Sequence, residues 1–347
     1  MNMGNQQGTE VLIRCDGSAG LGLGHIMRCL ALAMTLWENH TVIPTFALLD
    51  DGVGRNIVTQ HGFSCLIKPA PLEEGAWIES LLQTRSFKTI ILDIRTNLPA
   101  SHLNRWRAAG IVVAIIDDPS NRRQAADLTF YPPVPQLAGA DWREFTGKAY
   151  IGWDYILLRK EFRTAKPRPH NPTPLLLVTM GGSDPGGLTF LALEALRQVH
   201  EPFHAKVVLG RAFLHGEQLA RMQSGLPGHI EFLYDVDYMS ALMAECDLAI
   251  AAFGGTAYEL AALNVPSILL GLTPDHARSA EALEKAGMAV SLGYYQKVKA
   301  RDLAVAIAFF LNNPHMNACM SAACCALDGS GTERVAQIIC ERMTAHA

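Results

Sequence analysis

A glycine-rich run that ends in a histidine is the part of this sequence best suited to chemistry. It begins as Arg14-Cys15-Asp16-Gly17-Ser18 and ends as Gly20-Leu21-Gly22-Leu23-Gly24-His25. Alternating glycines let a backbone turn sharply and approach a ligand closely. The free N–H groups of a following helix attract anions, and an imidazole titrates near neutral pH. The run therefore predicts an active-site loop in which His25 transfers a proton.

Two other interpretations of this loop stay open. It could be a tight strand-to-helix connection, or it could begin a dinucleotide site, because Gly20-Leu21-Gly22 starts the corresponding spacing. Against the dinucleotide site, His25 stands where the third glycine would fall, and the acidic residues at 50–51 come late. Asp16 and Arg28 flank the loop, either as an ion pair that fixes it or as contacts to a substrate.

Composition narrows the class of protein. The 347 residues are 49% hydrophobic and 18% charged, which is typical of a globular protein with two domains. A net charge of -4 argues against nucleic acid as a partner and favours small molecules. Eight cysteines without a CxxC motif predict free thiols, no metal and no cofactor. The polar N-terminus and the lack of a long apolar stretch predict a cytoplasmic protein with no membrane partner. We expect a monomer or weak homo-oligomer.

Short apolar runs alternate with helical patterns along both halves of the chain. This alternation predicts two α/β domains with parallel sheets, at 1–165 and 174–347, joined by a proline-rich linker at 166–174. Two such Rossmann-like domains would present their loops to a central cleft. The expected strands are Val11–Arg14, Ile43–Leu49, Thr89–Asp93, Val112–Ile116, Leu175–Thr179, Ala205–Leu209, Glu231–Leu233, Leu248–Ala251 and Ser267–Leu270, and the expected helices include Ile26–Glu38, Leu103–Ala109, Leu188–Val199 and Met239–Glu245.

Three loops of the second half also follow predicted strands. Gly181-Gly182-Ser183-Asp184 leads into a helix near Leu188, where a phosphate could bind. Phe253-Gly254-Gly255-Thr256 offers backbone N–H groups and a hydroxyl to a diphosphate. Glu259 suits a ribose diol or, alternatively, is an ordinary first-turn acid that complements the helix dipole. Asp275-His276 precedes another helix, where Asp275 could simply be an N-cap.

The order of these motifs resembles a known family, the UDP-sugar hydrolases of pseudaminic acid biosynthesis. The resemblance covers nearly the whole chain. The matching stretches are Ile13–Ser18, Gly22–Ala33, Ile115–Asp118, Tyr155–Phe162, Gly181–Pro185, Phe253–Leu260 with Pro266-Ser267, and Asp328–Gly331. The glycine–histidine–arginine–cysteine pattern at 22–33 is specific, whereas the two glycine pairs recur across nucleotide-sugar glycosyltransferases with the type B (GT-B) fold.

The resemblance implies a GT-B-like fold and a metal-independent reaction. The substrate would be a UDP-2,4-diacetamido-2,4,6-trideoxy sugar, cleaved by water at the anomeric carbon with inversion. His25 would be the general base with Asp16 beside it. The implied contacts to UDP lie in the second domain, at Gly181, Gly182, Ser183, Asp184, Phe253, Gly254, Gly255, Thr256 and Glu259. The implied contacts to the sugar are Gly22, Gly24, Arg28, Asp93, Arg95, Asp275 and His276.

Three departures from the family pattern fall on the sugar side. The chain has Asp93-Ile94-Arg95 where the family carries Asp-His-Tyr, Asp275-His276 where Asn-Gln is usual, and no Asp-Gln-Asn ending after 127–132. Arg95 at the end of a strand suggests a more anionic or differently substituted sugar. Two alternative functions stay open: a glycosyltransferase with the same nucleotide site and a sugar acceptor, and a non-catalytic nucleotide-sugar-binding protein of surface-glycan assembly.

Overall fold

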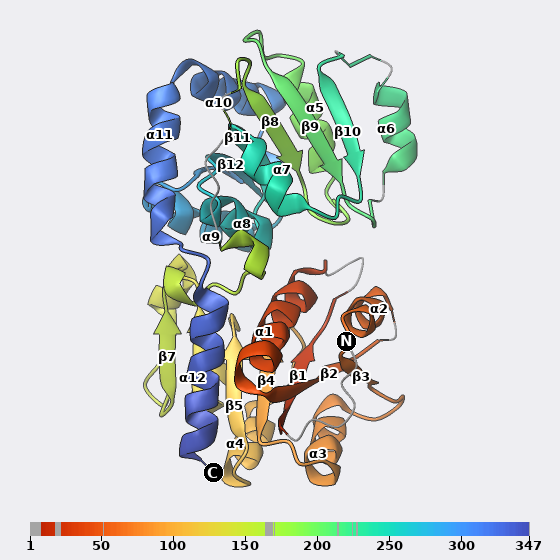
Figure 1. Cartoon of the computed structure of the whole chain (residues 1–347), viewed down its shortest axis with the longest axis vertical. Helices are drawn as coiled ribbons and strands as arrows, with labels where there is room; N and C mark the ends of the chain where they lie inside the picture. Colours follow the sequence, from red (N-terminus) through yellow and green to blue (C-terminus); the bar gives the residue numbers. More distant parts are fainter. Residues whose placement is uncertain are drawn as a thin grey trace. The chain divides into compact units, whose positions relative to one another are not determined.

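The computed structural model describes residues 8–17, 22–50, 52–163, 169, 171–213, 215–223, 225–226 and 228–346. Gly20 of the glycine-rich loop and residues 166–168 and 170 of the predicted linker lie outside these residues. The chain forms two compact units (Figure 1). The first consists of Met1–Pro133, Leu137–Arg159 and Ser330–Ala347, and the second of Val134–Gln136 and Lys160–Gly329.

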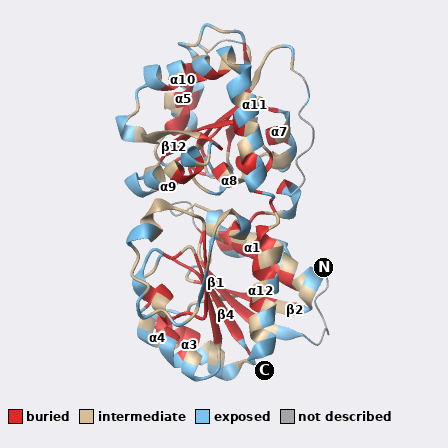
Figure 2. Cartoon of the chain, turned by 90° about the vertical axis from the view of Figure 1, so that its left-hand side faces the viewer, coloured by how far each residue is buried: buried red, intermediate tan, exposed pale blue. Residues whose placement is uncertain are grey.

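The first unit is built on a parallel sheet of seven strands in the order β3-β2-β1-β4-β5-β6-β7. Its central strands are buried on both faces, as expected where helices cover a parallel sheet (Figure 2). The strands are β1 (Thr9–Cys15), β2 (Val42–Leu48), β3 (Ser64–Ile67), β4 (Thr89–Asp93), β5 (Val112–Ile116), β6 (Leu128–Tyr131) and β7 (Lys148–Ile151), and the helices are α1 (Gly24–His40), α2 (Val53–Gln60), α3 (Glu74–Thr84), α4 (Ala100–Ala108) and α12 (Gly331–Ala345).

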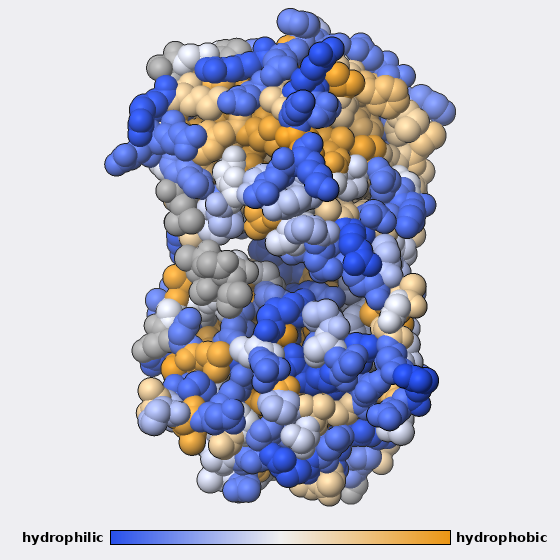
Figure 3. All heavy atoms as spheres, turned by 180° about the vertical axis from the view of Figure 1, so that it is seen from behind, coloured by the Kyte–Doolittle hydropathy of each residue, from blue (hydrophilic) through white to orange (hydrophobic). Residues whose placement is uncertain are grey.

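The second unit repeats this plan with six parallel strands in the order β10-β9-β8-β11-β12-β13. The apolar runs that predicted its strands form the buried core between sheet and helices. The strands are β8 (Leu175–Thr179), β9 (His204–Leu209), β10 (Ile230–Tyr234), β11 (Leu248–Ala252), β12 (Ser267–Gly271) and β13 (Val290–Tyr294), and the helices are α5 (Leu188–Leu196), α6 (Gly216–Gln223), α7 (Met239–Glu245), α8 (Gly255–Ala262), α9 (Pro274–Lys285), α10 (Ala300–Asn312) and α11 (Pro314–Ala323). Figure 3 shows apolar side chains gathered on one face of this unit.

The expected boundary at 174–347 is wrong for the end of the chain, because α12 belongs to the first unit. Val335, Ala336 and Ile339 are fully buried in the same cluster as the apolar face of α1. Arg342 donates to Asp127 over 3.0 Å, and Asp127 also accepts from the Val113 N–H. Apolar burial and this buried carboxylate thus hold the last helix on the first sheet.

Strand order decides which loops meet. In the first unit β1, β4 and β5 are neighbours, so the residues after their carboxyl ends lie at one edge of the sheet. In the second unit β8, β11 and β12 are neighbours, so the loops at 180–184, 253–256 and 272–276 share an edge. Among the described residues, no helix is long and apolar enough to cross a membrane.

Candidate active site

His25 and Asp93 form the centre of the site in the first unit. Nδ1 of His25 lies 2.6 Å from Oδ1 of Asp93, which is fully buried at the end of β4. A carboxylate only accepts, so Nδ1 carries the proton and donates it to Asp93. Nε2 then presents its lone pair, and it makes no hydrogen bond to any residue that the structure describes. The histidine side chain keeps 21% of its surface exposed, so a solvent or ligand molecule can reach it.

Arg28 fixes the other side of the Asp93 carboxylate. Its Nε and one terminal nitrogen donate to the two carboxylate oxygens, each over 2.6 Å. Burial alone would raise the pKa of Asp93, but the charges and hydrogen bonds of Arg28 and His25 outweigh it and hold that pKa well below its usual range. Asp93 therefore stays ionised at neutral pH and keeps the histidine in one tautomer. With both oxygens engaged and no exposed surface, Asp93 positions His25, which corrects its assignment as a contact to the sugar.

Arg28 also links this pair to Asp117, which follows β5. Its second terminal nitrogen donates to Oδ2 of Asp117 over 3.2 Å, and Arg95 donates to the same oxygen over 3.2 Å. The alternative in which Arg28 and Asp16 form an ion pair is wrong, because Asp16 pairs with Arg14 and Arg28 with Asp93 and Asp117. Arg95 lies at the end of β4, as expected, but its charge is matched by that of Asp117.

Asp16 belongs to a separate network at the end of β1. Arg14, fully buried, contacts Asp16 at 2.6 Å and donates to Glu74 over 2.8 Å. The other oxygen of Asp16 accepts from the Leu49 N–H over 2.9 Å. This arrangement favours the structural alternative for Asp16: its carboxylate anchors the start of the glycine-rich loop and takes no part in the His25–Asp93 pair.

Gly22 and Gly24, which precede His25, differ in whether their backbone conformation requires a glycine. Gly22 has a φ of +79°, a left-handed conformation that L side chains rarely adopt. Gly24 begins α1, and a side chain there would meet open space. The first turn of α1 has neither a side-chain cap nor an acidic residue. Among the described residues, no capping side chain therefore satisfies its N–H groups beside His25.

In the second unit, helix α8 follows one of the loops predicted to bind UDP and begins without a capping side chain. Its N-cap is Gly254, there is no side-chain cap, and the first turn carries no acidic residue. Side chains built at Gly254 or Gly255 would meet nothing within 4 Å. Glu259 is the fifth residue of α8 and lies beyond its first turn. The alternative interpretation of Glu259 as a first-turn acid is therefore wrong. At the same edge of the sheet, the centre of the Phe253 ring lies 5.9 Å from the centre of the His276 ring.

The loop at 181–184 differs from the expected phosphate cradle. Asp184 is buried, and its two carboxylate oxygens accept from the N–H groups of Leu188 and Thr189 over 2.8 and 2.9 Å. Asp184 therefore caps α5 and occupies the donors that a phosphate would need there. Burial outweighs these bonds and raises its pKa. Gly181 and Gly182 remain exposed, whereas Ser183 is buried.

Asp275 is held by a glutamine from a distant part of the sequence. The side-chain nitrogen of Gln136 donates to Asp275 Oδ1 over 3.0 Å and to Ser279 Oγ over 2.8 Å. The N-cap of α9 is Thr273, whose hydroxyl accepts from the His276 N–H. The N-cap alternative for Asp275 is therefore wrong, and the Gln136 contact was missed because no pattern links residues 139 positions apart.

Comparison with known sequences gives two distant relatives, and no model of a protein family matches the chain. An uncharacterized protein of Methanocaldococcus jannaschii is 26% identical over 271 residues, or 75% of this chain. The chain spans only 55% of the length of that relative. The spore coat polysaccharide biosynthesis protein SpsG of Bacillus subtilis is 24% identical, with 85% of this chain and 86% of SpsG aligned.

Solved structures decide the fold. MurG of Acinetobacter baumannii superposes with a TM-score of 0.69 at 15% identity, covering 95% of this chain and 99% of MurG. Anabaena HepE, solved in complex with UDP-glucose, superposes with a TM-score of 0.64 at 14% identity, covering 97% and 99% of the two chains. The chain has a GT-B-like fold. This confirms the expected fold class, with parallel sheets of seven and six strands.

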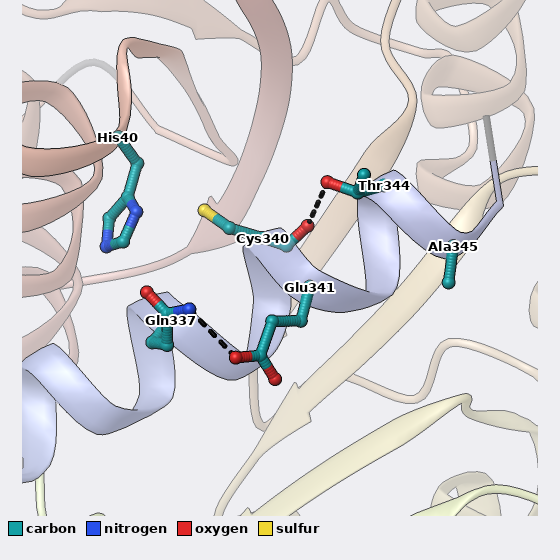
Figure 4. A pocket seen from close by; sticks show the side chains of 6 residues that line it. All are labelled: His40, Gln337, Cys340, Glu341, Thr344 and Ala345. Atoms are coloured by element: carbon teal, nitrogen blue, oxygen red, sulfur yellow. Dashed lines mark hydrogen bonds between the residues drawn. The ribbon is translucent and has the colours of Figure 1, made fainter.

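The GT-B-like chain also carries a surface depression that is not part of this site. It has a volume of about 430 Å³ and is lined by His40, Gln337, Cys340, Glu341, Thr344 and Ala345 (Figure 4). His40 is the last residue of the 17-residue helix α1 and His25 is its second, so the two histidines are about 22 Å apart. Burial raises the pKa of the Cys340 thiol to about 11, which leaves it protonated and unreactive at neutral pH.

Proposed function

We propose that the protein hydrolyses a UDP-linked sugar to the free sugar and UDP. The observation that carries the proposal is the His25–Asp93 pair, in which Nδ1 is committed to a buried carboxylate and Nε2 is available as a base. Asp93 and Arg28 hold the ring in place before a substrate arrives, so little reorganisation is needed during the reaction.

In the proposed reaction, a water molecule bonds to the anomeric carbon while His25 Nε2 takes one of its protons. The bond between that carbon and the UDP oxygen breaks, and UDP leaves with the bonding electron pair. Attack opposite to the leaving group inverts the anomeric centre. The first turn of α8 supplies N–H groups for the negative charge that grows on the diphosphate, with Thr256, Phe253, Glu259 and the exposed glycines at 181 and 182 beside it.

The substrate we propose is a UDP-2,4-diacetamido-2,4,6-trideoxy sugar of nonulosonic acid biosynthesis. The support is the resemblance of residues 22–33 and 253–260 to the hydrolases of that pathway. The role of SpsG in spore coat polysaccharide biosynthesis and the UDP-glucose complex of HepE support a place in surface-glycan assembly.

UDP release without an acceptor is the test of this proposal. We expect the purified protein to release UDP from its UDP-sugar in buffer alone, with the free sugar first appearing as the inverted anomer in NMR spectra. UDP release that requires an added sugar acceptor would instead support a glycosyltransferase. Tight binding without any release would support a nucleotide-sugar-binding protein, and either result overturns the hydrolase.

A substitution at the start of α8 tests where the diphosphate binds. We expect Gly255→Asp to weaken UDP binding about tenfold or more, because it places a carboxylate where the diphosphate would lie. The helix itself should tolerate the change, since an acid in the first turn is favourable and position 255 opens to free space. Calorimetric titration with UDP measures the effect. Gly255→Asn is the matched control, and equal affinities of the two variants would place the diphosphate elsewhere.

A further inference from the structure

Asp117 is a carboxylate that the sequence patterns did not single out as a site residue. It follows β5 with a φ of +49°, a conformation that costs energy in any residue with a side chain. Its N–H donates to the Phe130 carbonyl over 2.9 Å, which helps to hold this turn. Such strain persists only where the surrounding structure fixes it, and here it sets the direction of one carboxylate.

The adjacent Asp118 shows what that turn achieves. Asp118 is buried, and its two oxygens accept from the Ser120 N–H and from Arg122, over 2.8 and 2.7 Å. The side chain of Asp117 instead keeps 28% of its surface exposed and reaches the site. The two neighbouring carboxylates therefore differ: Asp118 stabilises the loop, and Asp117 stays partly exposed beside Arg28 and Arg95.

The guanidinium group of Arg28 connects Asp117 to the proposed base, His25. Arg28 donates to Asp117 Oδ2 with one terminal nitrogen, and its other terminal nitrogen lies 3.1 Å from Nδ1 of His25. Arg95 donates to the same Oδ2. The other oxygen, Oδ1, accepts no hydrogen bond from any residue that the structure describes. The site therefore presents two acceptors, Nε2 of His25 and Oδ1 of Asp117.

The charges of this group cancel. Arg28 and Arg95 contribute two positive charges, Asp93 and Asp117 two negative ones, and the proposed base is neutral. A neutral site gives no net attraction to a carboxylate on a sugar, and Oδ1 would repel one. A hydroxyl or amide N–H on the sugar, by contrast, can donate to Oδ1 as a charge-assisted hydrogen bond.

We propose that Asp117 determines sugar specificity: it accepts a hydrogen bond from a hydroxyl or amide N–H of an uncharged sugar and excludes sugars that carry a carboxylate. This inference deepens the proposed function and rests on it. It also replaces the interpretation of Arg95 as a sign of an anionic sugar, because Asp117 balances the charge of Arg95.

Two variants change the charge of the site in opposite directions. Asp117→Asn leaves one net positive charge, and asparagine tolerates the left-handed conformation as well as aspartate does. Arg95→Ala leaves one net negative charge. We use UDP, UDP-N-acetylglucosamine and UDP-glucuronic acid as probes in calorimetric titrations, in a His25→Ala background to suppress turnover. Asp141→Asn is the matched control, an exposed carboxylate of the same unit paired with Arg143.

Asp117→Asn should shift the affinity ratio of the acidic to the uncharged sugar nucleotide about tenfold towards the acid, and Arg95→Ala should shift it the opposite way. The affinity for UDP alone and the ratio in Asp141→Asn should not change. An unchanged ratio in both site variants, with UDP still bound, overturns the role of Asp117 and leaves the proposed function standing. Failure of all variants and of the parent protein to bind UDP overturns both.

Discussion

His25→Ala is expected to lower kcat for UDP release by about 10²–10⁴-fold, the usual contribution of a positioned general base. The physical reason is the state of the imidazole: Nδ1 is bonded to Asp93, and Nε2 is the acceptor that can take a proton from water. The affinity for UDP should stay within about twofold, because the proposed diphosphate contacts lie on α8 of the second unit. The loss should therefore appear in kcat and not in UDP binding.

His40→Ala is the matched control, since it removes a histidine from the opposite end of the same helix. It lies beside the depression in Figure 4 and should keep the parent rate. His25→Gln adds a second variant that preserves side-chain length and hydrogen bonding but cannot act as a base near neutral pH. Turnover by both His25 variants within a few-fold of the parent protein would show that the proton is taken by another group.

The elements that position this site were largely predictable from sequence. Strands β4, β5 and β8 have the predicted bounds, because fully buried parallel strands consist of continuous apolar runs. Strands β3, β7 and β13 were missed, since they lie at the edges of their sheets and none of their residues is buried. Edge strands of this kind have no clear periodicity for a pattern to detect. The four-residue strand β6 was missed although it is buried.

The partners of the site residues were much harder to predict. The resemblance implied Asp93 as a contact to the sugar, but its bonds to His25 and Arg28, which lie 68 and 65 positions away, were not predicted. The role of Asp117 depends on a left-handed backbone angle that an Asp-Asp pair does not reveal. Asp184 was counted among the implied UDP contacts as part of the loop at 181–184, yet its carboxylate caps α5.

Asp93→Asn should produce the second large effect, a fall in kcat of about 10²–10⁴-fold with UDP affinity unchanged. Asparagine has nearly the same shape, but its amide can donate where the carboxylate only accepts, so it no longer enforces the Nδ1–H tautomer. Loss of the charge also removes the ion pair with Arg28 and should cost about 2–3 kcal/mol of stability. Initial rates of UDP release and urea unfolding measure the two effects.

Asp127→Asn separates catalysis from stability. Asp127 is also a buried carboxylate, contacted by Arg107 and Arg342, but it precedes β6 at the opposite edge of the sheet from the end of β4. It should lower stability without a comparable loss of kcat.

The low pKa of Asp93 also makes the stability of the protein depend on pH. The contribution of Asp93 to stability is complete above its unfolded-state pKa of about 3.9 and is lost as the pH falls towards its native pKa. The stability difference between parent and Asp93→Asn should therefore shrink on acidification below about pH 4. Equal losses of kcat in Asp93→Asn and Asp127→Asn would reduce Asp93 to a structural residue and remove the main support for His25 as an oriented base.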